Sequence, residues 1–286
     1  MNLIRLMRPS NWLKNIFCLL PLLFSHQFFN TSLYSVQALM FIAFCFAASA
    51  VYIVNDLVDV DVDKLHPAKC TRPLAVGSVN KTSAVILCVL LMIGAIVLSI
   101  SINWKTCVVI IIYLLLNIAY SFYLKHIEIV DVFIIALGFV LRIYAGGFAT
   151  DIVISKWLAV TALSFSLFLA FSKRFSEFKL QEEQDVEIRP SLRYYSVSFL
   201  SSCLSVSLVL SLIFYSFWCF TLDSSLAGSP MVFTIPFVLF ILLKYMLILE
   251  NENVSADPVI VIFNNKQLLL AVLVYAVLTV VILTLT

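Results

Sequence analysis

Long apolar segments alternate with short polar stretches along almost the whole chain. A window of about 19 residues, which is suited to membrane-spanning helices, selects nine apolar segments. Each is close to the ~20 residues that an α-helix needs to cross a bilayer. The pattern predicts an all-α polytopic membrane protein that forms a single integral membrane domain over residues 1–286. The nine predicted transmembrane helices cover residues 13–30, 35–55, 83–102, 105–123, 129–149, 156–173, 194–220, 231–249 and 267–285.

Basic residues gather on one side of these predicted helices. The N-terminal stretch and the loops between helices 2–3, 4–5, 6–7 and 8–9 hold or adjoin fifteen of the eighteen Lys and Arg residues. The other side has only Lys105 and Lys156, and Arg142 lies inside the fifth helix. By the positive-inside rule, we expect a plasma (inner) membrane protein with a cytoplasmic N-terminus, a cytosolic polar cap and an external C-terminus. Lys14, Asn15 and Pro21 interrupt the first segment, which favours a retained helix over a cleaved signal peptide.

Composition excludes several other classes of protein. Hydrophobic residues make up 63% of the chain and charged residues only 12%, which is not the balance of a soluble globular domain. The seven cysteines form no C-x-x-C pair and the three histidines are far apart, so we expect neither a disulfide framework nor a zinc site. We also expect no nucleic-acid partner.

The most polar stretch follows the second predicted helix. Residues 56–63 hold four carboxylates, and Asn55, Asp59 and Asp63 are spaced four residues apart. If the helix continues, these three side chains share one face, Asp56 lies at its rim and Asp61 lies off it and is dispensable. Oxygen ligands of this kind favour Mg²⁺, which is often completed by substrate phosphates. The stretch predicts a Mg²⁺–diphosphate site, and the alternative is a solvated acidic helix end.

Basic and aromatic residues after this stretch suit a phosphorylated substrate. Lys69 and Arg72 follow within ten residues, and Lys125 lies in the loop between helices 4 and 5 beside Tyr123 and Asp131. Lys and Arg can take the phosphate oxygens that a metal leaves free. The alternatives are lipid-headgroup anchors for Lys69 and Arg72, an interfacial belt for the tyrosine, and a favourable helix start for Asp131.

Further cations lie in or near the later predicted helices. An arginine such as Arg142 inside a membrane helix usually faces a cavity or a partner, so it either approaches a substrate phosphate or pairs with Asp131. Lys173 and Arg174 are expected at the end of the sixth helix, where cations are favoured in any case, with Glu177 one turn further on. Lys244 approaches the same cytoplasmic rim.

These residues resemble the UbiA superfamily of intramembrane prenyltransferases. Its first Asp-rich motif corresponds here to Asn-Asp-x-x-Asp-x-x-x-Asp over residues 55–63, and the opening Arg8-Pro9-Ser10-Asn11-Trp12-Leu13-Lys14-Asn15 fits it too. The resemblance is closer to the branch of decaprenyl-phosphate phosphoribosyltransferases and spans almost the whole chain. The branch-like stretches are His66-Pro67-x-Lys69-x-x-Arg72-Pro73, Leu124-Lys125 to Asp131, Gly138 to Gly147, Lys173-Arg174-x-x-Glu177, and Lys244-Tyr245 with Asp257-Pro258.

The chain departs from the typical prenyltransferases of that superfamily at one place. They carry a second Asp-rich motif after the sixth helix, where this sequence has Lys173, Arg174 and Glu177. With cations where the typical enzymes have carboxylates, this position would bind an anion directly and would not bind a metal ion. Such a site suits a second phosphorylated substrate. The resemblance then implies a UbiA-like helix bundle and an enzyme.

The implied reaction is Mg²⁺-dependent transfer of a 5-phosphoribosyl group from phosphoribosyl diphosphate to a polyprenyl phosphate, with inversion at C1. The alternatives are a UbiA-type prenyltransferase acting on an aromatic or other small acceptor, and a non-enzymatic lipid transporter or binder. The implied lipid is decaprenyl-like, and a homo-oligomer is compatible with the sequence. The expected catalytic residues are Asp56, Asp59 and Asp63, with Asn55 as a further metal ligand; the expected substrate-binding residues are Lys14, Asn15, Lys69, Arg72, Tyr123, Lys125, Asp131, Arg142, Lys173, Arg174, Glu177 and Lys244.

Overall fold

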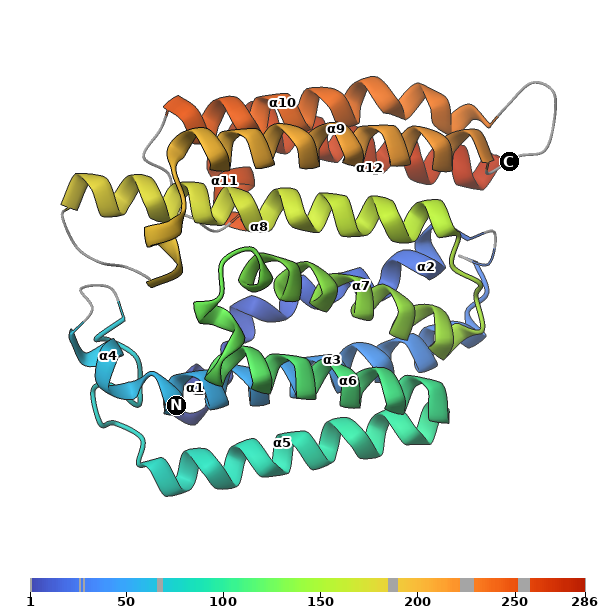
Figure 1. Ribbon diagram of the computed structural model, residues 1–286. Coiled ribbons are helices and arrows are strands. Elements are labelled where there is room, and N and C mark those ends of the chain that lie inside the picture. Colours follow the sequence, from blue (N-terminus) through green and yellow to red (C-terminus); the bar gives the residue numbers. More distant parts are fainter. Residues whose placement is uncertain are drawn as a thin grey trace. The chain divides into compact units, whose positions relative to one another are not determined.

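The computed structural model describes residues 2–25, 27, 29–65, 69–184, 190–221, 229–251 and 258–285, and within them the chain is helical, without a strand (Figure 1). Four short 3₁₀ helices, η1 to η4, interrupt or precede the α-helices. In chain order the elements are α1 (Asn2–Met7), η1 (Pro9–Leu19), α2 (Leu20–Leu23), α3 (Ser32–Val58), α4 (Val60–Leu65), α5 (Lys81–Ile102), α6 (Trp104–Phe122), η2 (Leu124–His126), α7 (Val130–Thr150), α8 (Lys156–Gln184), η3 (Pro190–Tyr194), α9 (Val197–Thr221), η4 (Pro230–Thr234), α10 (Ile235–Asn251), α11 (Pro258–Asn264) and α12 (Lys266–Leu285).

Eight of these helical stretches are long and apolar enough to cross a membrane. They correspond to the second through ninth predicted segments, with η4 and α10 forming one stretch, so the prediction of an all-α membrane bundle is confirmed. The main difference is in α8, which was predicted to end at residue 173 and continues to Gln184. The extension is rich in Glu, Gln and Lys, which are good helix formers, so loss of hydrophobicity there does not end the helix.

The first predicted span, over residues 13–30, is wrong in its bounds and its helix type. Residues 9–23 form η1 and α2, and the chain turns at Phe24. A 3₁₀ helix rises about 2.0 Å per residue against 1.5 Å in an α-helix, so these fifteen residues extend about 28 Å. That length approaches the ~30 Å hydrocarbon core with fewer residues than an α-helical span requires.

The chain forms two compact units. Unit 1 comprises Met1–Ile134 and Gly138–Val153, and unit 2 comprises Ile135–Leu137 and Ile154–Thr286.

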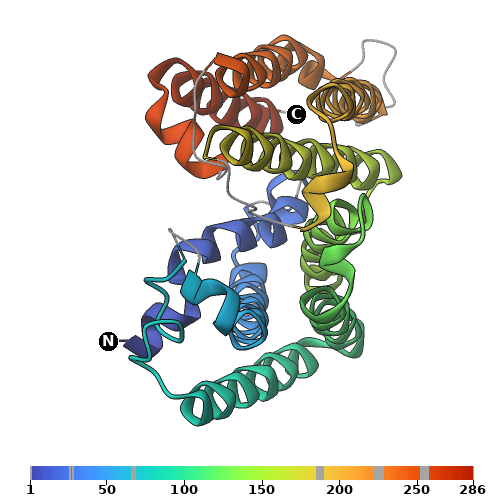
Figure 2. The same ribbon diagram turned by 60° about the vertical axis from the view of Figure 1, so that its left-hand side comes forward.

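Helix α3 is the centre of unit 1. It packs against η1, α1, α5 and α6, and Figures 1 and 2 show α5 and α6 running alongside it. Small residues of α3, namely Ala43, Ala47 and Ala50, are completely buried at these contacts. Such residues let helix backbones approach closely, which is the usual route to tight packing where lipid supplies no hydrophobic driving force.

Unit 2 is built on contacts of α8 with α9 and of α10 with α9 and α12. Hydrogen bonds among three side-chain hydroxyls link three of its elements. The hydroxyl of Tyr215 in α9 lies 2.5 Å from that of Thr234 in η4 and donates to that of Tyr275 in α12 at 3.2 Å. Interhelical hydrogen bonds of this kind hold membrane helices in one register.

Gly146 allows a close contact between the backbones of α7 and η1 in unit 1. A Cβ added at Gly146 would lie 1.8 Å from the carbonyl oxygen of Cys18. The same oxygen accepts a hydrogen bond from the side-chain amide of Gln37 in α3, so it is held from a second side. The backbone of η1 therefore has little room to withdraw.

Replacing Gly146 by Ala should destabilise the protein by at least about 1–3 kcal/mol, because one backbone must move away from the other. Unfolding of the purified protein in detergent measures the change. Gly94→Ala is the matched control, since its added Cβ would meet only the edge of the Phe46 ring at 3.0 Å. Equal stability of the two variants would contradict the contact.

Candidate active site

The acidic stretch begins in the last turn of α3 and continues into α4. The helix ladder bends at Asp59 but is not broken, because the amide of Asp59 donates to the carbonyl of Asn55 at 2.9 Å and that of Asp63 to the carbonyl of Asp59 at 2.8 Å. The predicted continuation of the helix is therefore present, with a bend at its middle member.

Asp56 and Asp63 form one group with two arginines. Nη1 of Arg72 donates to Oδ1 of Asp56 at 3.1 Å and to Oδ2 of Asp63 at 2.5 Å, and Nη2 of Arg8 also donates to Oδ1 of Asp56. Both carboxylates are buried, Asp56 at 1% and Asp63 at 2% exposure. Buried carboxylates need such partners, because removing a charge from water is expensive.

Asp59 belongs to a second group on the same stretch. Its Oδ1 accepts from the ammonium group of Lys125, which lies in η2, and its Oδ2 accepts from the side-chain amide of Asn55 at 3.1 Å. The contacts divide the residues of the predicted face into two groups, Asn55 with Asp59 and Asp63 with Asp56. Arg72 joins Asp63 to Asp56, because it reaches both across the bend.

Arg8 is the site residue that the sequence analysis missed. It precedes η1 in a left-handed conformation, with φ of 53°, and its guanidinium lies 5.0 Å from the centre of the Tyr52 ring. The hydroxyl of Ser49 donates to the carbonyl of Met7 at 2.9 Å and accepts from the indole of Trp12 at 3.0 Å. The residues before and after Arg8 are thereby hydrogen-bonded to α3. The signal was its place at the head of the Arg8-Pro9 motif.

Asn15 and Arg142, both predicted to bind substrate, contact each other. Nε of Arg142 donates to Oδ1 of Asn15 at 2.8 Å, Nη1 to the carbonyl of Gly138 at 2.7 Å and Nη2 to the hydroxyl of Tyr113 at 3.0 Å. All three acceptors are uncharged, so the alternative pairing of Arg142 with Asp131 does not occur. The aromatic rings of Tyr113, Phe44 and Phe139 around the guanidinium supply further stabilisation.

The remaining predicted residues of unit 1 have varied surroundings. Lys14 and Lys69 are half-buried, and Tyr123 is 75% exposed with its ring 6.3 Å from that of Phe122. Asp131 is buried in the first turn of α7, where it was expected. His66, Pro67 and Asp257 of the family-like stretches lie outside the described residues.

The predicted residues of unit 2 lie on α8 and α10. Because α8 continues to Gln184, Lys173 and Arg174 stand within the helix and the favourable position at a helix C-terminus does not account for them. Arg174 is completely buried and donates to Glu177 at 2.6 Å. Lys244 lies in α10, half-buried.

The acidic residues fit Mg²⁺ shared with a phosphate. Among the described residues, no three Asp, Glu, His or Cys side chains are placed to ligate one ion. Mg²⁺ does not require such a set, because it usually takes one or two carboxylates together with water and phosphate oxygens. Oδ2 of Asp56 is buried without a hydrogen-bond partner, and Asp63 is held beside it through Arg72. This pair could hold the ion.

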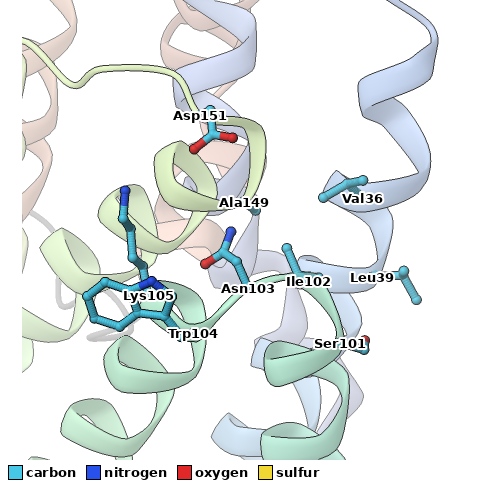
Figure 3. A pocket seen from close by; sticks show the side chains of 9 residues that line it. All are labelled: Val36, Leu39, Ser101, Ile102, Asn103, Trp104, Lys105, Ala149 and Asp151. Carbon is cyan, nitrogen blue, oxygen red and sulfur yellow. The ribbon is translucent and has the colours of Figure 1, made fainter.

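A pocket of about 390 Å³ at the other end of unit 1 is a poorer candidate (Figure 3). It is lined by Val36 of α3, which is twenty residues, or about 30 Å, before Asp56. Its Asn103 already caps α6 through the amide of Thr106 and donates to the carbonyl of Phe148 at 2.7 Å. These contacts indicate a structural turn.

A model described as the UbiA prenyltransferase family matches residues 16–266. The chain belongs to the UbiA prenyltransferase family. With eight long apolar helices in the described residues, this UbiA-family chain is a multi-pass membrane protein. The predicted family and fold class are confirmed.

Curated relatives and solved structures agree with this assignment. Decaprenyl-phosphate phosphoribosyltransferase of Mycolicibacterium smegmatis is 32% identical, over 93% of this chain and 87% of that protein. The protein of the same name from Corynebacterium glutamicum is 34% identical, over 77% and 68%. A UbiA homologue from Archaeoglobus fulgidus, solved bound to GPP and Mg²⁺, superposes with a TM-score of 0.74 at 17% identity, covering 99% of this chain and all of that one.

The contact of Arg8 with Asp56 can be tested by a double-mutant cycle. Arg8→Gln should lower the free energy of unfolding by about 1–2 kcal/mol, because Asp56 then keeps a single cation in a buried position. The effect should disappear in an Asp56→Asn background, as measured by unfolding in detergent. Arg5→Gln, an exposed arginine in α1, is the matched control and should change stability by less than about 0.5 kcal/mol. Additive effects in the cycle would contradict the pairing.

Proposed function

We propose that this protein transfers a 5-phosphoribosyl group from phosphoribosyl diphosphate to a polyprenyl phosphate of the decaprenyl type and releases diphosphate. The observation that carries the proposal is the alternation of carboxylates and cations at the end of α3, where Arg8, Arg72 and Lys125 contact Asp56, Asp63 and Asp59. A Mg²⁺–diphosphate group needs both kinds of ligand. The names of relatives that span most of the chain support the choice of substrates.

Asp56, Asp59, Asp63 and Asn55 are the proposed metal-site residues. When bound, Mg²⁺ would neutralise the diphosphate and make it a better leaving group. Arg8, Arg72 and Lys125 now pair with carboxylates. When a metal ion neutralises the charge of these carboxylates, the three cations can donate hydrogen bonds to phosphate oxygens instead. Arginine suits this exchange, because its planar fork binds a phosphate as well as a carboxylate.

Catalysis rests mainly on positioning and electrostatics. The acceptor oxygen of a lipid phosphate is already anionic, so no strong general base is needed. It attacks C1 of the ribosyl donor while the bond from C1 to diphosphate breaks, through an oxocarbenium-like transition state. Arg142 acts by holding Asn15 in η1. The other proposed substrate-binding residues are Lys14, Lys69, Tyr123, Asp131, Lys173, Arg174, Glu177 and Lys244.

The distribution of charge supports a cytoplasmic site in the plasma membrane, with the C-terminus outside. Eight crossings alone would leave both termini on one side, so this orientation also requires the segment of η1 and α2 to cross. Its length of about 28 Å is compatible with that. We take the two units to work together as one integral membrane domain, and a homo-oligomer is compatible with it.

Purified protein incubated with Mg²⁺, labelled phosphoribosyl diphosphate and polyprenyl phosphate should move label into the lipid phase. Replacing Asp56, Asp59 or Asp63 by Asn should reduce the rate at least about 100-fold, because each supports charge on the leaving group. Asp61→Asn is the matched control and should stay near the unmodified rate.

Asp61 is a suitable control because it is exposed and pairs with Lys64 at 2.8 Å. The hydrogen bond and charge of Lys64 lower the pKa of Asp61, so the Asn substitution removes a charge there. Equal loss in all four variants would indicate a general charge effect. Prenyl transfer from a prenyl diphosphate to a small acceptor, with no label in the lipid, would favour the prenyltransferase alternative.

Direct displacement inverts the configuration at C1, so an α-linked donor should give a β-linked lipid product. The anomeric coupling in the NMR spectrum of the product measures this outcome. Retention would require two successive displacements and a covalent intermediate, and would contradict the one-step reaction.

A further inference from the structure

A lysine lines an apolar groove in unit 2, and the described residues of that unit supply no counter-ion for it. The groove has a volume of about 790 Å³ and lies between α10 and α12, which run side by side in Figures 1 and 2. Lys244 and Gln267 are its polar lining residues, and most of the remainder is apolar, including Phe237, Phe240 and Leu270. Within the described part of unit 2, neither polar side chain makes a hydrogen bond or ion pair.

The position of Lys244 makes its lack of a partner informative. It lies seven residues, or about 10 Å, before the end of α10, inside a stretch apolar enough to cross a membrane. A charged lysine among apolar side chains is costly, and it normally faces a partner, a cavity or the membrane interface. Lys244 lines the groove and has no counter-ion among the described residues, so an anion that enters the groove would supply one.

Both polar side chains lie in the part of the groove nearer the connection between α10 and α12, where Leu247 is the remaining lining residue of α10. Gln267 is the second residue of α12, and the short helix α11 contacts both α10 and α12 where the two are connected. Seven residues further along α12, Val274 lines the groove, and eight residues before Lys244, Pro236 does so in α10. The groove thus has a polar part and an apolar part that extends about 10 Å or more along the two helices.

We infer that this groove binds the acceptor lipid of the proposed reaction, with Lys244 and Gln267 at its phosphate and the isoprenoid chain along Phe237, Phe240 and Val274. The inference rests on the proposed function and adds the place of one substrate. A single cation and a single amide match one phosphate. The ribosyl donor has several phosphates and no apolar part, so it matches neither the charge nor the wall.

Steady-state kinetics can separate the two substrates. Lys244→Gln should raise KM for a polyprenyl phosphate about 10-fold, and should leave KM for phosphoribosyl diphosphate within about 2-fold. Lys244→Arg should restore much of the affinity, because it keeps the charge. Lys266→Gln is the matched control, since Lys266 is exposed and adjacent to Gln267 but does not line the groove. An equal change in both KM values, or none, would overturn the inference.

Photolabelling tests the location without relying on transfer. A polyprenyl phosphate carrying a diazirine on its chain should label residues 236–247 and 267–274 of the full-length protein in nanodiscs. Unlabelled polyprenyl phosphate should compete, and Lys244→Gln should reduce labelling several-fold. Labelling elsewhere, or equal competition by phosphatidylglycerol, would overturn the assignment. A protein that labels as expected yet transfers no ribosyl group would instead refute the proposed function.

Discussion

The pairing of three carboxylates with three cations at the end of α3 is the interaction on which the rest of unit 1 depends. Asp56 in the last turn of α3 and Asp63 in α4 are both buried, where an uncompensated charge would be costly. Their partners come from separate parts of the chain: Arg8 from the segment before η1, and Arg72 from the loop before α5. Lys125 in η2 does the same for Asp59. The acidic stretch therefore also fixes the path of three connecting segments.

Hydrophobic patterning predicted most of the fold, because eight spans depend mainly on length and apolarity. It failed where backbone geometry decides. In residues 9–23 the 3₁₀ helix η1 followed by the short α2 covers a similar distance with fewer residues, and hydropathy contains no information on rise per residue. The helix α8 extends beyond its apolar part. Residues of high helix propensity and ion pairs such as Arg174 with Glu177 stabilise the helix where hydrophobicity ends.

The sequence predicted which residues belong to the site better than it predicted which of them contact one another. Spacing identified Asn55, Asp59 and Asp63, and the ladder does continue through them. Spacing could not show that Arg72 bridges Asp56 and Asp63, because that depends on the path of a loop. Arg8 was missed for a similar reason: it is 48 residues from Asp56, and only the left-handed turn and the contacts of Ser49 bring it there.

The cations around the acidic stretch differ from Lys244 in their partners, and the difference bears on what each can bind. Arg8, Arg72 and Lys125 are matched by three carboxylates, so the group has no net charge. A metal ion or a diphosphate entering alone would unbalance it, whereas the two together exchange partners with little change in net charge. Such a group favours a metal–diphosphate pair over either component. Lys244 has no matching carboxylate in the described part of unit 2, and it suits an anion that arrives without a metal. A donor carrying a diphosphate and a lipid carrying one phosphate are the two classes of ligand that this division of charge distinguishes.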